Sequence, residues 1–118
     1  MTRQRFAPAL DGNRFRVLQR DDSLPLLLFF TLPTSGPARR MESLLAHLAR
    51  KERDRLQVSR VDAGERPELA EKLGVTSIPT LVLIKDRKPV DRIEGRASAP
   101  QIERMLEPYL AQPASAAA

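Results

Sequence analysis

The sequence predicts an α/β domain in which a mixed sheet is covered by helices on both faces. Apolar runs of strand length alternate along the chain with amphipathic stretches of helical period, which is the pattern of layered α/β folds. The length of 118 residues suits one domain. Hydrophobic residues make up 42% of the chain and charged residues 30%, so the composition is that of a folded protein. We assign residues 1–111 to the domain and residues 112–118 to a disordered tail.

The beginning of the chain predicts two elements before a core strand. Residues 4–7 fit a short edge strand, and residues 12–20 fit a helix capped by Asp11. Residues 24–30 form a continuous apolar run between turn-forming residues, as in a strand that is buried on both faces. We expect this run to be the central strand of the sheet.

The longest helix is predicted to begin after Ser35 and to run to about Arg53. Ser35 is placed as an N-cap, and Pro37 falls in the first turn, where a missing backbone N–H breaks no helical hydrogen bond. The buried stripe of this helix consists of Met41, Leu44, Leu45 and Leu48.

A second strand and a short helix follow. Residues 56–61 alternate apolar with polar side chains, which predicts a strand that ends near Asp62. Pro67 opens a short helix, and Gly74 is a typical residue to end it. The inward face of this helix consists of Leu69, Ala70 and Leu73.

A hairpin and a last helix complete the predicted domain. Residues 80–84 and 90–94 fit two antiparallel strands joined by a turn at residues 85–88, and Gly95 marks the end of the second strand. Apolar residues then recur at helical spacing over residues 99–111.

The residue counts exclude several classes of function. The chain has no cysteine, so it has no disulfide, thiolate metal site or thiol redox group of its own. Its one histidine, His47, is too few for a His-rich zinc site. The formal charge is +5, but the basic residues are spread along the chain and only five residues are aromatic, which disfavours nucleic acid as a partner.

The apolar segments are also too short to suggest a membrane protein. The longest apolar run, residues 24–32, has about half of the roughly twenty residues that a membrane helix needs. The first ten residues lack the apolar core of a secretory signal. We therefore expect a cytoplasmic protein with no membrane contact.

Three segments resemble the thioredoxin family. Residues 30–39 read Phe-Thr-Leu-Pro-Thr-Ser-Gly-Pro-Ala-Arg, where thioredoxins have a strand, a Trp-Cys-Gly-Pro-Cys loop and the start of a helix. Residues 61–75 are similar to the family's third strand and the helix after it. Residues 75–81 look like the family's cis-proline loop, with Pro79 as that proline, and Gly95 matches a late glycine. The resemblance implies the thioredoxin fold, with a central mixed sheet of four to five strands.

The departures from the family fall on the positions that carry its chemistry. Ser35 and Ala38 stand where the resemblance places the two redox cysteines. A serine hydroxyl and a methyl group cannot perform thiol–disulfide exchange at neutral pH. Four further replacements are Phe29 for a buried acid, Arg60 for its lysine partner, Thr34 for the loop tryptophan and Ser43 for a helix proline.

These residues predict a protein without dithiol/disulfide oxidoreductase activity, with no catalytic residues and no cofactor. The resemblance implies that it binds another polypeptide, or assists its assembly, in the groove beside the cis-proline. In an equally open interpretation, Pro79 only shapes its loop. The residues that would line the groove are Thr34, Ser35, Gly36, Pro37, Ser77, Ile78, Pro79, Gly95 and Arg96.

Other side chains have alternative interpretations. Ser35 is either a helix cap or part of a site for an anion or a thiolate such as that of glutathione, since a helix N-terminus favours negative charge. In the second case the chain would be a glutathione- or thiol-binding enzyme relative in which Ser35 orients the thiolate of the substrate. His47 lies about 18 Å from Ser35 by helix rise, which excludes a Ser-His pair within the chain.

Two groups of charged residues also have a functional and a structural interpretation. The carboxylates Asp62, Glu65, Glu68 and Glu71 look like a cluster, but solvated charges in a turn and at a helix start explain them. Arg39 and Arg40 either attract an acidic partner or are ordinary surface charges. A basic accessory subunit for nucleic acid stays as a third hypothesis, with salt-dependent binding as its test.

Overall fold

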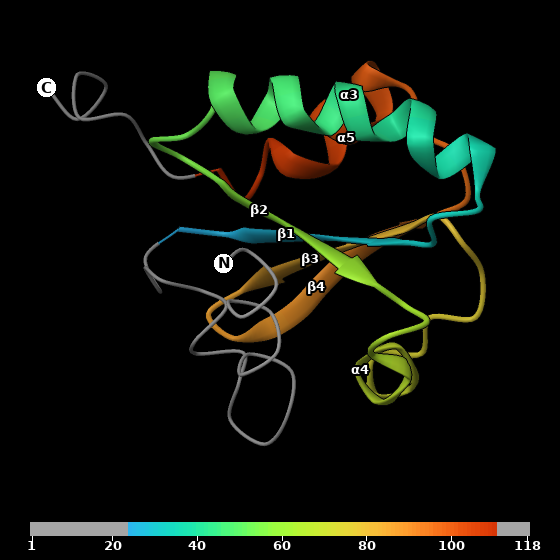
Figure 1. The fold of residues 1–118 in the computed structure, drawn as a ribbon. Coiled ribbons are helices and arrows are strands. Elements are labelled where there is room, and N and C mark those ends of the chain that lie inside the picture. The colour runs from blue at the N-terminus through green and yellow to red at the C-terminus, as the bar shows by residue number, and fades with distance from the viewer. Residues whose placement is uncertain (1–23, 111–118) are drawn as a thin grey trace, which may run out of the picture.

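The structure, a computed structural model, describes residues 24–110. A four-stranded mixed sheet runs through it in the order β2-β1-β3-β4 (Figure 1). The strands are β1 (Leu26–Thr31), β2 (Gln57–Asp62), β3 (Thr80–Lys85) and β4 (Lys88–Glu94). β1 pairs in parallel with β2 and antiparallel with β3, and β3 pairs antiparallel with β4. β1 is therefore an interior strand, as its continuous apolar sequence predicted.

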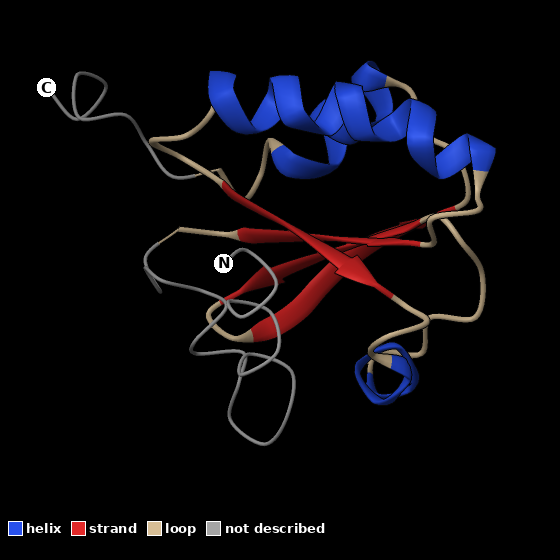
Figure 2. Ribbon diagram, in the orientation of Figure 1, coloured by secondary structure: helices blue, strands red, loops and turns tan. Residues whose placement is uncertain are grey.

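Helices lie on both faces of the sheet. α3 (Gly36–Lys51) and α5 (Ala99–Leu106) cover one face, and α4 (Pro67–Lys72) lies on the other (Figure 2). None of the helices within residues 24–110 is long and apolar enough to cross a membrane. The predicted strand at 4–7, the predicted helix at 12–20 and the predicted tail at 112–118 lie outside the described residues.

The side chains of β1 divide between two cores because successive residues of a strand point to opposite faces. All six residues of β1 are buried. Leu26, Leu28 and Phe30 pack in the core beneath α4. Leu27 and Phe29 pack in the core beneath α3 and α5. The apolar side of a helix thus packs on each face of the sheet. This packing fixes where the helix ends lie relative to the strand ends.

Several element boundaries differ from the prediction, and β1 and β2 each begin later than expected, at Leu26 and Gln57. α3 ends at Lys51, and residues 52–55 form turns rather than a last helical turn. β4 begins at Lys88 instead of residue 90, so the hairpin turn consists only of Asp86 and Arg87, both with positive φ. α5 ends at Leu106, well before residue 111, because Pro108 has no N–H with which to continue a helix.

Candidate functional site

The strand register brings three segments to one edge of the sheet. Phe30 of β1 pairs with Thr80 of β3, and Thr80 pairs with Glu94 of β4, so these residues form one row across the sheet. The loop after β1, the segment before β3 and the segment after β4 all leave the sheet at this row (Figure 1). The predicted site residues lie on these three segments.

The Ser35–Ala38 turn is the start of α3. Ser35 has extended backbone angles, and its Oγ accepts a hydrogen bond from the Ala38 N–H at 3.2 Å, as predicted for an N-cap. The Ser35 N–H donates to the Leu32 carbonyl at 3.0 Å and closes the preceding turn. Ala38 is fully buried, while Thr34 and Gly36 are exposed. A Cβ at Gly36 would meet no atom within 4 Å, so the space beside it is open.

The second segment contains Ile78 and Pro79. The Ile78–Pro79 peptide bond is cis, and Pro79 is buried. The Pro79 carbonyl accepts a hydrogen bond from the Gly95 N–H at 2.8 Å. This bond joins the third segment to the second and places Arg96, the next residue, beside them. Gly95 has a φ of 84°, a conformation that favours glycine.

Ile78 has an unusual combination of a packed side chain and unpaired backbone groups. Its side chain packs against both apolar cores of the sheet. Its backbone N–H and C=O form no hydrogen bond with any residue from 24 to 110. The neighbouring Ser77 carbonyl, by contrast, accepts from the Thr80 hydroxyl at 2.7 Å. A backbone N–H or C=O without a partner in its own chain forms hydrogen bonds with water or with another chain.

A model of the thioredoxin family matches residues 8–108 of this sequence. The chain belongs to the thioredoxin family. It is 33% identical to the thioredoxin of Alicyclobacillus acidocaldarius over 100 residues, covering 85% of this chain and 93% of the relative. It is 30% identical to thioredoxin 1 of Synechococcus elongatus over 104 residues, covering 88% and 97%.

Solved structures agree with this assignment. The thioredoxin of Fasciola hepatica superposes with a TM-score of 0.74 at 27% identity, covering 81% of this chain and 91% of that one. A mutant thioredoxin of Halobacterium salinarum gives a TM-score of 0.75 at 25% identity, covering 87% and 88%. The predicted thioredoxin fold is confirmed. Unlike the redox-active pattern of the family, this sequence contains no cysteine.

The positions that the thioredoxin resemblance assigned to a proton relay have no such role here. Phe29 is 2% exposed and packs in the same apolar core as Ala38. Arg60 is exposed, and its Nε pairs with the Glu42 carboxylate on α3 at 2.8 Å. The phenyl ring of Phe29 cannot carry a proton, and Arg60 is held at the surface by its ion pair with Glu42.

The carboxylates that resemble a cluster in the sequence have separate structural roles, as the interpretation of solvated charges expected. The Asp62 carboxylate accepts hydrogen bonds from the backbone N–H groups of Gly64 at 2.8 Å and Glu65 at 3.2 Å, which fixes the turn after β2. Glu68 and Glu71 are exposed on α4. In the described part of the chain no group of three or more His, Cys, Asp or Glu side chains can hold a metal ion.

A hollow that the sequence did not predict lies between α3 and α5, away from the Ser35 end of α3. It has a volume of about 590 Å³ and is lined in part by the end of α3 and the charged face of α5. Lys51 pairs with Glu103 at 3.6 Å, and Arg55 pairs with Glu52 at 2.8 Å. These mutual pairs leave the hollow without a clear charge preference for a ligand.

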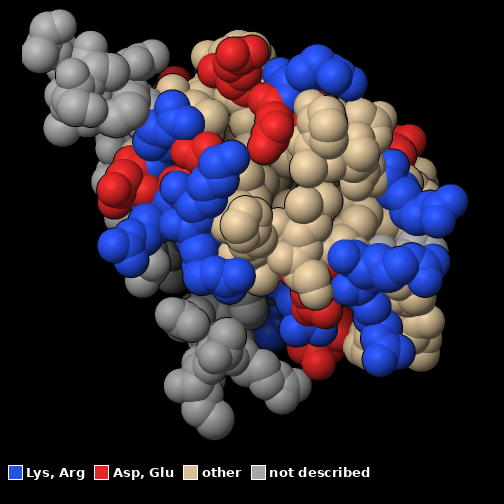
Figure 3. Space-filling model, turned by 90° about the horizontal axis from the view of Figure 1, so that it is seen from above, with Lys and Arg blue, Asp and Glu red and all other residues tan. Residues whose placement is uncertain are grey.

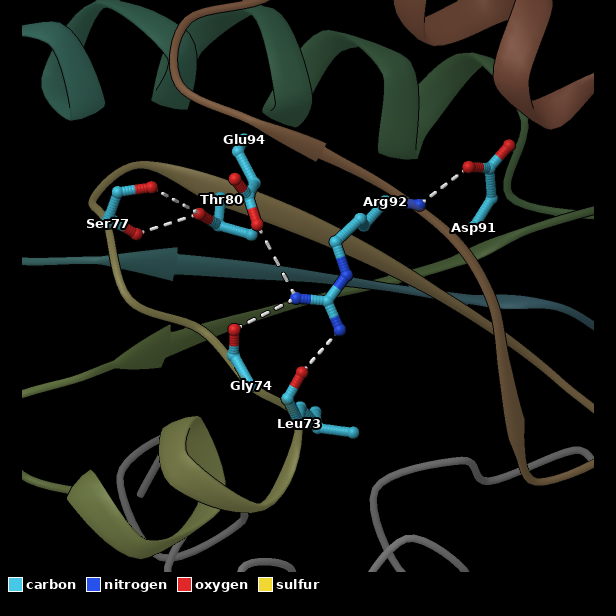
Figure 4. A network of polar contacts seen from close by, with 7 residues as sticks. All are labelled: Leu73, Gly74, Ser77, Thr80, Asp91, Arg92 and Glu94. Atoms are coloured by element: carbon cyan, nitrogen blue, oxygen red, sulfur yellow. Dashed lines mark hydrogen bonds and ion pairs between the residues drawn. The ribbon is translucent and has the colours of Figure 1, made fainter.

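Arg92 is a site-supporting residue that sequence reasoning missed. It stands opposite Val82, whose side chain faces α4, and cross-strand partners share a face. Its guanidinium donates to the Gly74 carbonyl at 3.1 Å and to the Leu73 carbonyl, and it lies 3.8 Å from the Glu94 carboxylate (Figure 4). Arg92 therefore ties β4 to the end of α4, directly before the segment that carries Ile78.

We expect Arg92→Met to lower the free energy of unfolding by about 1–3 kcal/mol, because two carbonyls lose a charged hydrogen-bond donor. Urea titration followed by circular dichroism measures this change. The control is Lys88→Met, an exposed position on the same strand, which should change stability by less than about 0.5 kcal/mol. Equal effects of the two substitutions would show that the Arg92 contacts contribute nothing.

Proposed function

We propose that this thioredoxin-family protein has no dithiol/disulfide oxidoreductase activity and binds an extended segment of another polypeptide beside Pro79. The absence of sulfur at Ser35 and Ala38 supports the first part, because thiol–disulfide exchange needs a thiolate to attack and a second thiol to resolve the mixed disulfide. A role in assembling the bound polypeptide and a cytoplasmic location stay predictions.

The observation that carries the binding proposal is the backbone of Ile78, whose N–H and C=O form no hydrogen bond within residues 24–110. An extended partner segment running past Ile78 can donate one hydrogen bond and accept another, as neighbouring strands do. The Ile78 side chain is held by both cores, so its backbone is presented in a fixed position. Little conformational entropy would be lost on the protein's side of such a contact.

We name the residues on the three segments the Pro79 surface. They are Thr34, Ser35, Gly36, Pro37, Ser77, Ile78, Pro79, Gly95 and Arg96. The alternative ligand, an anion or the thiolate of glutathione at Ser35, has less support. The Ala38 N–H that such a ligand would use already donates to the Ser35 Oγ. A polypeptide that pairs with Ile78 leaves this cap undisturbed.

A phage-displayed library of random linear peptides tests the proposal. We expect the immobilised protein to enrich peptides that bind Gly36→Tyr about tenfold more weakly, since a ring beside the open space at Gly36 blocks approach to the Pro79 surface. Ala46→Tyr places the same ring on the exposed face of α3 and should bind like the wild type.

Amide hydrogen exchange gives a second readout. The Ile78 N–H should exchange rapidly in the free protein and become protected when an enriched peptide is added. Equal binding of the peptides to Gly36→Tyr, or an Ile78 amide that exchanges equally with and without peptide, would refute the proposed function.

A further inference from the structure

We infer that the polypeptide segment bound at the Pro79 surface is acidic, an inference that rests on the proposed function and adds the chemistry of the partner. Arg96 belongs to this surface, and Arg39 and Arg40 follow the Pro79-surface residues of α3 along the helix; all three arginines are exposed. The Arg39 N–H donates to the Ser35 carbonyl at 3.1 Å, so Arg39 lies one helical turn from the cap. Arg96 follows Gly95, whose N–H is bonded to Pro79.

No carboxylate of the described residues neutralises these three guanidinium groups. Within residues 24–110, Arg39, Arg40 and Arg96 form no ion pair. Glu42, three positions after Arg39, pairs instead with Arg60 at 2.8 Å. The surface therefore keeps positive charge that a partner's carboxylates can satisfy.

Two carboxylates near the strand ends at this edge already have partners. The Asp62 carboxylate accepts two backbone N–H groups in the turn after β2. The Glu94 carboxylate lies 3.8 Å from the Arg92 guanidinium. Arg92 offsets the charge of Glu94, and Asp62 sets one negative charge against the three arginines, so an approaching anionic segment still meets a net positive field.

The opposite end of the helical face differs. There Lys51 pairs with Glu103 and Arg55 with Glu52, so basic and acidic side chains alternate. Figure 3 shows acidic side chains among the basic ones at its left edge, whereas basic side chains predominate at the right edge, where α3 begins, with uncharged surface between. Arg50, Arg53 and Arg104 at that end are also exposed and form no ion pair within residues 24–110, but the same segments carry the carboxylates of Glu52, Asp54, Glu103 and Glu107. On the face seen in Figure 3, the basic side chains at the start of α3 therefore have fewer acidic neighbours than those at its end.

The placement of Arg39 and Arg40 also opposes what helix stability alone favours. The first turn of a helix favours acidic side chains because its backbone N–H groups carry partial positive charge. α3 has no acidic residue in its first turn, and Arg39 and Arg40 follow directly. Negative charge from a bound segment would relieve this repulsion.

A polypeptide fits these observations better than a nucleic acid. Single-stranded nucleic acid is usually held by aromatic side chains on which the bases stack. Among the described aromatics, Phe29 and Phe30 are buried in the cores, and Tyr109 lies beyond α5. The Pro79 surface offers charge and the backbone groups of Ile78, which are unpaired within residues 24–110, and none of its residues is aromatic.

The test compares the peptide pools that different variants select from the random library. We expect the wild type to enrich Asp and Glu relative to the input library. Arg39→Gln, Arg40→Gln and Arg96→Gln combined should lose this bias. Arg50→Gln, Arg53→Gln and Arg104→Gln combined remove the same charge from exposed positions at the other end and should keep it.

An acidic peptide from the wild-type pool should bind the first triple variant about tenfold more weakly at an ionic strength of about 0.01 M. The difference should disappear at about 1 M, where screening acts within about 3 Å. The inference would be overturned if the peptides selected by the wild type were not enriched in Asp and Glu, or if both triple variants selected equally acidic peptides. In either case, weaker peptide binding to Gly36→Tyr would still support the proposed function. If Gly36→Tyr bound the selected peptides as tightly as the wild type does, the proposed function itself would be refuted. A random single-stranded oligonucleotide serves as the nucleic-acid probe. If it bound as tightly as the acidic peptide and lost this binding in the Arg39, Arg40 and Arg96 triple variant, the arginines would be assigned to nucleic acid and the inference would be overturned.

Discussion

The wild-type protein should not accelerate the reduction of insulin by dithiothreitol, whereas the double variant Ser35→Cys, Ala38→Cys should accelerate it. The physical reason is the geometry of the α3 start. Residues three apart at a helix N-terminus have Cα atoms about 5 Å apart, from helix rise and radius. That separation lies within the range that a disulfide spans.

The exposure of residues 35 and 38 also matches the roles of the attacking and the resolving thiol. Ser35 is half-buried at the helix N-terminus, where a thiolate is stabilised and accessible to a substrate. Ala38 is fully buried beneath it, where a second thiol is sheltered until it resolves the mixed disulfide. At these two positions the scaffold therefore retains the geometry for a cysteine pair and lacks the two sulfur atoms.

The rate of insulin precipitation measures the reductase activity that the double variant is expected to gain. Ser35→Cys alone and Ala38→Cys alone are the controls, and neither should turn over, because a single thiol stops at the mixed disulfide. Turnover by the wild-type chain would contradict the proposed function. A double variant that folds, forms its disulfide and still fails to reduce insulin would show that the altered surroundings of Ser35 also prevent the chemistry.

Within residues 24–110 the sequence was sufficient to predict the order of the elements and the interior place of β1 in the sheet. β1 and β3 are unbroken apolar runs, and the α3 stripe has a clear helical period, so local pattern and burial agree at these places. The capping role of Ser35 was also predictable, because Ser followed by Gly and Pro carries its own helix-start signal.

Features that depend on contacts between distant segments were not predictable. The hairpin turn shrinks to Asp86 and Arg87 because Lys85 pairs with Lys88, a ladder contact that polar residues do not signal. Arg92 reaches the end of α4 across eighteen residues of sequence. The three segments of the Pro79 surface come together through the row of Phe30, Thr80 and Glu94, and only the family resemblance indicated that neighbourhood beforehand.

Phe29→Asp, which restores the acid that the resemblance places in the family, is expected to lower the free energy of unfolding by at least about 4 kcal/mol. Phe29 is 2% exposed, and truncating a buried phenylalanine alone costs about 3–5 kcal/mol. The introduced carboxyl would also lie among apolar side chains without a basic partner, since Arg60 is on the surface and paired with Glu42.

The pH dependence distinguishes the buried acid from the cavity. Burial raises the pKa of the introduced carboxyl above its value in the unfolded chain, about 3.9. The folded state then keeps its proton while the unfolded state loses it, so stability falls as pH rises above about 4, by about 1.4 kcal/mol per pH unit, until the folded carboxyl also ionises. Phe29→Asn has a similar shape and does not titrate, so its difference from the wild type should stay constant over the same range.

Urea titrations of Phe29→Asp, Phe29→Asn and the milder Phe29→Leu between about pH 4 and pH 7 measure these effects. Phe29 and Ala38 belong to one apolar core, and a thioredoxin that works by thiol exchange has a buried acid and a thiol at these two positions according to the resemblance. If Phe29→Asp and Phe29→Asn lose stability equally at every pH, the introduced acid is solvated, and the core beneath Ser35 has kept access for water and protons. If they diverge as predicted, the core beneath Ser35 excludes water, and the phenyl ring of Phe29 stabilises the fold at the position where the resemblance places the family's acid.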